Sequence, residues 1–150
     1  RQFDYRKING NPDKGRFGAY TLNPETMLLD WGAIPREKIK VFDFKEMLSR
    51  PFSEIAEHAL IKHGLTHHLL GIEYAEHLAR NPDKIPDSLM DGSYYFLFGS
   101  VFYDNDGVVR VMCTHLRRRF CNIGACVWCR CAGRLDRRWE SNDRVIMVEK

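Results

Sequence analysis

The sequence has no run of apolar residues long enough to cross a bilayer. Its longest stretch without a charged residue, residues 92–103, has 12 residues, whereas a membrane-spanning helix needs about 20. It also lacks an Asn-x-Ser/Thr acceptor site and the nucleotide-binding patterns GxxxxGK[S/T] and GxGxxG. No GxSxG nucleophile motif occurs either. These absences argue against a membrane-spanning protein and against the common nucleotide-dependent and serine-hydrolase classes.

The composition is that of a folded globular chain. Of the 150 residues, 44% are hydrophobic and 29% are charged, which excludes a disordered protein. At this length we expect one compact domain. It is organised as strands and turns over residues 1–50, a helical segment over 51–91 and a β region over 92–150.

The first segment predicts short strands. Arg16–Leu22 and Thr26–Trp31 flank the turn sequence Asn-Pro-Glu at 23–25, which is typical of a hairpin. A third apolar run, Ile39–Phe42, predicts another strand.

The middle segment predicts two short helices. Ser53 is a candidate N-cap and Gly64 a natural stop. The apolar stripe of this helix comprises Ile55, Ala59, Leu60 and Ile61. The second helix runs from about Gly71 to Arg80, because Pro82 disfavours a helical conformation at Asn81. Its predicted buried face comprises Ile72, Ala75, Leu78 and Ala79.

The last segment predicts antiparallel strands at Tyr94–Tyr103, Val108–Leu116, Gly124–Ala132 and Arg144–Val148. The sequence Asp104–Gly107 between the first two is a hairpin turn, because the later ligands of a calcium loop are missing. We therefore expect an α+β fold in which three or four C-terminal strands form a small curved sheet or open barrel, with the helix pair covering one side.

The net charge of +3 hides an uneven distribution. Between Gly107 and Trp139 there are eight Arg, no Lys and one acid, so this segment carries +7 and the remainder −4. Arginine suits phosphate because its planar guanidinium donates two parallel hydrogen bonds, and aromatic side chains interleaved with Arg hold single-stranded nucleic acid. The alternative is a solvated strip whose arginines pair with acids elsewhere in the chain. The candidate nucleic-acid-binding residues are Arg110, Arg117, Arg118, Arg119, Phe120, Trp128, Arg130, Arg134, Arg137 and Arg138.

All five cysteines lie between residues 113 and 131. Cys126 and Cys129 have the C-x-x-C spacing of a zinc site, which Cys113 or His115 with Cys121 would complete. Against zinc, Val127 and Trp128 favour a strand rather than the tight turn of a zinc knuckle. Cys129 and Cys131 are two apart, as are Cys113 and His115, so each pair points to one face of a strand, as small core residues would. We therefore expect no cofactor and keep zinc at Cys113, Cys121, Cys126 and Cys129 as the alternative.

Five histidines fall in the helical middle: His58, His63, His67, His68 and His77. Glu54 with His58, and Glu73 with His77, have the i, i+4 spacing of local helix pairs. His63 and His67 also have that spacing, but Gly64 between them indicates that the helix has ended. His67 and His68, in an expected interhelix loop, are the pair that merits a test for a catalytic or metal role.

The sequence thus favours a small non-enzymatic binding protein whose basic, aromatic C-terminal face contacts nucleic acid or another polyanion. A metal- or thiol-dependent enzyme using the cysteine cluster is one alternative. A protein-interaction subunit that meets an acidic partner is another. The odd cysteine number favours a cytoplasmic location, and no membrane is expected among the partners. Since the sequence begins at Arg1 rather than Met, we expect the native start to precede it.

Overall fold

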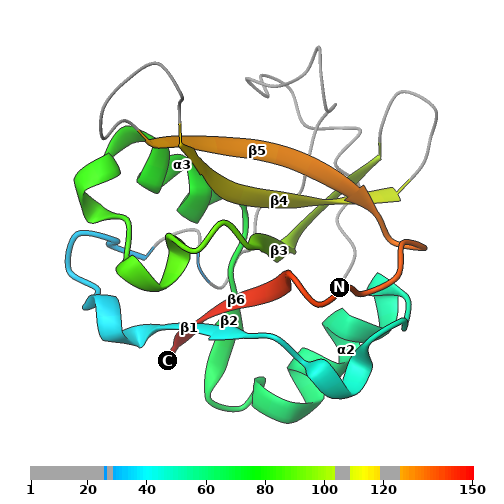
Figure 1. The fold of residues 1–150 in the computed structure, drawn as a ribbon. Coiled ribbons are helices and arrows are strands. Elements are labelled where there is room, and N and C mark those ends of the chain that lie inside the picture. The colour runs from blue at the N-terminus through cyan, green and yellow to red at the C-terminus, as the bar shows by residue number, and fades with distance from the viewer. Residues whose placement is uncertain (1–25, 27–28, 104–108, 119–125) are drawn as a thin grey trace.

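Among the residues that the structure describes, the fold combines two α-helices with one six-stranded sheet. The computed structural model describes residues 26, 29–103, 109–118 and 126–150. The helices are α2 (Phe52–His63) and α3 (Ile72–Arg80). The strands are β1 (Ile39–Phe42), β2 (His67–Leu69), β3 (Tyr94–Tyr103), β4 (Val109–Arg118), β5 (Cys126–Arg134) and β6 (Asp143–Glu149). The α+β class is confirmed (Figure 1).

The sheet is mixed and takes strands from the whole described chain. Its order is β1-β6-β3-β4-β5, and β2 also pairs with β6. Strand β6 runs antiparallel to β1 and β2 but parallel to β3. Strands β3, β4 and β5 pair antiparallel, as predicted for the C-terminal segment. The prediction is wrong for the last strand, because β6 lies between β1 and β3 and runs parallel to β3 instead of extending an antiparallel C-terminal sheet.

Each face of the sheet is covered by its own helix. Successive side chains of a strand point to opposite faces, so Tyr95 and Leu97 of β3 pack with α3, whereas Phe96 and Phe98 pack with α2. The side chains of β6 also alternate between the two faces. Because both faces are covered, residues 145–148 are four consecutive buried apolar residues. Figure 1 shows α3 and α2 on opposite sides of the molecule. The expectation that both helices cover one side is wrong.

Helix α2 buries a narrower stripe than its sequence indicated. Ile55 and Ala59 are fully buried, but Leu60 is 51% and Ile61 77% exposed, because in a 3.6-residue period they turn away from the sheet. The N-cap is Pro51 rather than Ser53. The first amides of α2 are instead satisfied from the segment after β5: Phe52 N donates to Arg137 O at 3.0 Å, and Ser53 N to Leu135 O at 3.3 Å.

Helix α3 is positioned by β3. The buried hydroxyl of Ser100 accepts a hydrogen bond from Ile72 N at 2.8 Å, which satisfies one amide at the N-terminus of the helix. The helix ends at Arg80, before Asn81 and Pro82, as predicted. Ile72, Ala75 and Leu78 are buried in the core on this side.

The stretch between the helices forms strand β2, not the expected loop. Gly99 of β3 lies against it, and its amide donates to Leu70 O at 3.0 Å. A Cβ at residue 99 would come within 2.9 Å of the carbonyl oxygens of Leu69 and Leu70. A glycine is therefore required for this close approach.

Two sequence predictions lie outside the described residues: most of the N-terminal hairpin at 16–31 and the turn at 104–107. The strand predicted at Ile39–Phe42 is confirmed as β1. Within the described part of the chain, no helix combines the length and apolar character that a bilayer span requires.

Candidate functional site

The basic segment folds into a two-stranded ribbon at one edge of the sheet. Strands β4 and β5 pair antiparallel over nine positions, from Arg110–Arg134 to Arg118–Cys126. The register places Arg110 directly opposite Arg134 and Thr114 opposite Arg130. Arginines therefore recur along the length of the ribbon, whose outer strand β5 has no further neighbour among the described strands.

Two arginines at the C-terminal end of this segment are held by contacts within the chain. Arg134 donates from Nε and Nη2 to the two carboxylate oxygens of Asp136, each at 3.0 Å. Arg138 Nη1 donates to Ser49 O at 2.8 Å, beside a β-bridge between residues 51 and 138. At the C-terminal end of the arginine-rich segment, these contacts agree with the alternative in which its arginines pair with other groups of the same chain.

Arg137 has the most extensive set of contacts. Its guanidinium carbon lies 5.4 Å from the ring centroid of Phe52 and 5.6 Å from that of Phe96. Its Nη2 lies 3.6 Å from a carboxylate oxygen of Glu140 and 3.6 Å from Oδ1 of the fully buried Asp143. Burial raises the pKa of Asp143, while the Glu140 amide and Arg137 oppose that rise. Arg137 therefore contacts two aromatic rings of the core on the α2 side and a buried carboxylate.

Trp139, one of the aromatic residues among the arginines, is a core residue. It is 1% exposed, and its indole Nε1 donates to Asp43 O at 2.8 Å. Its ring packs against Phe52 with centroids 5.4 Å apart. It is therefore not part of an exposed stacking surface.

The other predicted ribbon residues are only partly described. Arg119, Phe120 and Cys121 lie outside the described residues. The remaining ones are placed by backbone register alone: Arg117, Arg118, Cys126, Trp128, Cys129 and Arg130.

Cys113 differs from a zinc ligand in two respects. Its side chain is 1% exposed in the core on the α2 side, and it forms a disulfide bond. A sulfur in a disulfide is not the thiolate that zinc requires. The register places Cys131 opposite Cys113 and Cys129 opposite His115. Among the described residues, no three His, Cys, Asp or Glu side chains are grouped to hold a metal.

Three of the five histidines surround two phenylalanines at the junction of β1 and α2. His63 stacks on Phe42 with ring centroids 4.0 Å apart, and His58 meets the Phe44 ring edge-on at 5.0 Å. The His67 ring lies 5.6 Å from that of His63. Burial lowers the pKa of His63, and the nearby His67, Lys62 and His58 lower it further.

A shallow pocket of about 360 Å³ adjoins these rings. Its charged lining includes both Asp43 and Glu46 and the cations Lys62 and Arg144. Glu46 lies 3.0 Å from His58 Nε2 and accepts from Lys62 Nζ at 3.1 Å. Its own backbone amide, then His58 and Lys62, lower the pKa of Glu46 to about 2. Because the opposite charges neutralise one another, this pocket does not select an ion of either sign.

Sequence reasoning identified the histidines but missed what they contact. Phe44 adopts a left-handed conformation with φ 46°, which is uncommon for a residue other than glycine. No local signal marks it. The alternating apolar run at 39–42 was the available signal for Phe42.

Comparisons of this chain with models of protein families, with curated proteins and with solved structures gave no match.

Proposed function

We propose that this protein is a non-enzymatic binding module that holds nucleic acid along the β4–β5 ribbon. One observation carries the proposal. The ribbon's register distributes arginines along its length: Arg130 lies opposite Thr114, and Arg117 and Arg118 lie at the far end of β4, opposite Val127 and Cys126. A row of arginine positions along an edge ribbon suits a polyanion, because each guanidinium can neutralise a phosphate.

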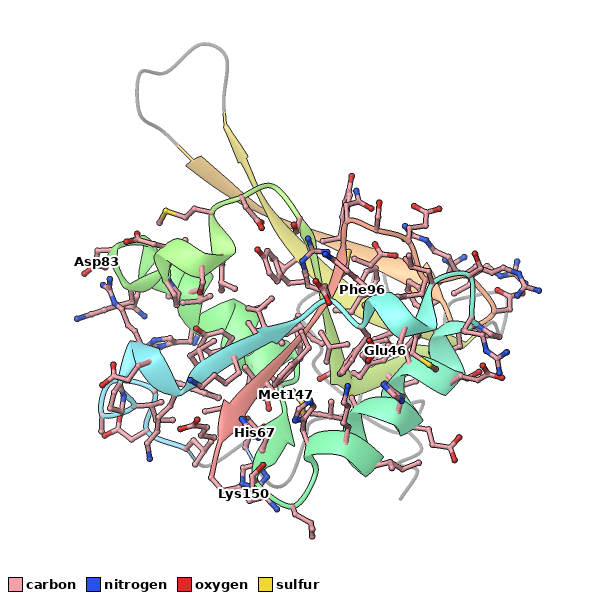
Figure 2. All side chains as sticks on the ribbon, turned by 60° about the horizontal axis from the view of Figure 1, so that its bottom comes forward. Glu46, His67, Asp83, Phe96, Met147 and Lys150 are labelled. Atoms are coloured by element: carbon pink, nitrogen blue, oxygen red, sulfur yellow. The ribbon has the colours of Figure 1, made fainter. Side chains whose placement is uncertain are left out.

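The shape of the ribbon supports the same proposal. A two-stranded β-ribbon is one of the two elements that fit the major groove of duplex DNA. The ends of β4 and β5 extend beyond the body of the protein (Figure 2). Since β5 is an edge strand, no described strand flanks it on its outer side.

The contacts of the described arginines narrow the proposed interface. Arg134, Arg137 and Arg138 each have partners within the chain. We therefore assign the main phosphate contacts to Arg117, Arg118 and Arg119 and keep Phe120, Trp128 and Arg130 as stacking or positioning residues. Stacking on aromatic residues would favour a single strand, whereas insertion of the ribbon would favour a duplex.

The test is a fluorescence-anisotropy titration with labelled single-stranded and duplex oligonucleotides of one sequence at low salt. Replacing Arg117, Arg118 and Arg119 together by Ala should weaken binding about tenfold or more. The slope of log K against log salt should fall by about 0.7–0.9 for each lost phosphate contact. The matched control replaces Lys38, Lys45 and Arg80 by Ala, which removes the same charge from positions outside the ribbon.

Each outcome is decisive. Loss of affinity in the ribbon variant but not in the control supports the proposal, and the better-bound strand form identifies the binding mode. Absence of binding to both oligonucleotides at low salt, or equal loss in both variants, overturns it. Salt-sensitive self-association without oligonucleotide binding would replace it with a protein-interaction role.

A further inference from the structure

A second, more enclosed pocket lies on the α3 side of the sheet, and none of the ribbon residues lines it. It has a volume of about 190 Å³ and is formed by residues 31–36, β1, α3 and residues 84–86. Three of its lining side chains carry aromatic rings: Trp31, Tyr74 and His77. Its apolar lining includes Ile39 and Leu78.

The three rings form a packed group. Trp31 and Tyr74 have centroids 4.9 Å apart, tilted by 53°. His77 lies 6.3 Å from Trp31 and 6.4 Å from Tyr74, the latter at an interplanar angle of 25°. These separations are typical of aromatic pairs, so the rings hold each other in place around the pocket without a ligand.

Tyr74 adds an unused polar group. Its side chain is 4% exposed, and burial strongly raises the pKa of its hydroxyl. The hydroxyl oxygen is not one of the buried polar atoms that lack a partner. It is therefore open to water and can form a hydrogen bond with a ligand in the pocket.

The charged side chains of the lining are all cationic. Arg36 and Lys84 line the pocket, and neither forms an ion pair with a carboxylate among the described residues. Arg36 Nη2 donates to Asp83 O at 2.8 Å, which fixes the side chain without neutralising it. Figure 2 shows Asp83 at the periphery of the molecule.

His77 lies against these cations and contributes no charge at neutral pH. Burial lowers its pKa, as does Lys84, whereas the nearby Asp30 raises it. The imidazole is therefore a neutral ring. The pocket combines aromatic walls, one accessible hydroxyl and two cations.

We infer that this pocket binds a small, flat aromatic anion: one ring, or two fused rings, bearing a carboxylate or a phosphate. The volume excludes larger ligands, because pockets for drug-sized molecules start at about 300 Å³. The ring packs against Trp31, Tyr74 and His77. Arg36 and Lys84 bind the anionic group, for which charge-assisted hydrogen bonds are the strongest available. This inference does not depend on nucleic-acid binding by the ribbon.

The test is isothermal titration with four probes: benzoate, indole-3-carboxylate, the uncharged benzamide and phenyl phosphate. Replacing Arg36 and Lys84 together by Gln should weaken binding of the anionic probes about tenfold or more. Binding of benzamide should stay within about twofold. Tyr74→Phe should weaken binding of the anion about five- to tenfold, because this substitution removes only the hydrogen bond of the hydroxyl. Arg80→Gln, a charge change on the same helix outside the pocket, is the control.

Saturable binding of an anionic probe that both pocket variants weaken and the control leaves intact supports the inference. Preference for phenyl phosphate over the carboxylates supports it and identifies phosphate as the anion. Absence of heat for every anionic probe at millimolar concentration overturns it. Equal affinities in the wild-type and Arg36→Gln/Lys84→Gln proteins overturn it too. A thermal melt of each variant confirms that it is folded before titration.

Discussion

The imidazole ring of His63 lies face to face with the phenyl ring of Phe42, with 4.0 Å between centroids and 19° between planes. This stack joins the last turn of α2 to the end of β1. Because burial lowers the pKa of His63 below 6.5, folding favours the neutral ring. Protonation therefore acts against the contact between these two elements.

The first prediction is a loss of stability at mildly acid pH. The unfolded state takes up the His63 proton near pH 6.5 and the folded state only at lower pH, so the free energy of unfolding falls as pH drops through that interval. His63→Phe keeps the stack and removes the proton. Urea denaturation at pH 7.5 and 5.5 should show a smaller difference for this variant than for the wild type. If the variant and the wild type lose the same free energy of unfolding between pH 7.5 and 5.5, His63 is not the cause. His77, whose pKa is also lowered, would then account for the loss.

The second prediction concerns the disulfide of Cys113. Cys131 is its direct neighbour in the register, and opposed residues of antiparallel strands are close enough for a disulfide. Peptide mapping without reductant should therefore link Cys113 to Cys131. Cys131→Ala should lower the free energy of unfolding by about 2–4 kcal/mol. Under reductant the wild type should lose the same amount, and the two proteins should converge. A Cys131 peptide recovered with a free thiol contradicts the pairing.

The third prediction compares the stability contributed by two ion pairs, one between Arg137 and the buried Asp143 and one between Arg134 and the exposed Asp136. Arg137→Ala leaves the carboxylate of Asp143 without its cation, and Asp143 is fully buried. We expect a loss of about 1–3 kcal/mol, less than for a fully buried pair because Arg137 is 37% exposed. Arg134→Ala breaks the exposed pair with Asp136 and should cost below about 1 kcal/mol. Adding Asp143→Asn to Arg137→Ala should recover part of the loss. Equal costs for the two single variants would show that Arg137 is only a surface residue.

The fourth prediction uses two isoleucines of one helix. Ile55 is fully buried and Ile61 is 77% exposed. Ile55→Ala should therefore lower the free energy of unfolding by about 2–5 kcal/mol, whereas Ile61→Ala should change it by less than about 0.5 kcal/mol. Chemical denaturation measures both. Comparable losses would mean that a partner covers the exposed end of α2.

Local patterns predicted the elements better than their arrangement. The helices, the strand at 39–42 and the strands of the C-terminal segment follow from hydrophobic periodicity and from Pro82, which are properties of neighbouring residues. The alternation of Phe96 and Leu97 could not show that both faces of β3 are buried, since that depends on where α2 and α3 dock. Likewise, no local pattern indicates that β6 pairs in parallel with β3.

The candidate sites were likewise predictable only where the signal lies in neighbouring residues. The arginine-rich segment was visible as a charge count, but the partners of Arg134, Arg137 and Arg138 could not be inferred, because Ser49 and Asp143 approach only in the folded chain. The pocket around Trp31 and Tyr74 joins residues more than forty positions apart. Its rings gave no periodic signal, and only the fold brings them together.

Strand β6 is the latest of the described strands in chain order, yet it lies between β1 and β3. While the chain is being synthesised, β1 and β2 therefore emerge long before their pairing strand. Helix α2 also emerges long before its partners, because the carbonyl groups that accept hydrogen bonds from its first amides belong to Leu135 and Arg137. Contacts this distant in sequence slow folding and leave strand edges exposed in the interim. A ribosome-bound chain that stops short of Asp143 should consequently be a target for chaperones rather than a half-built domain.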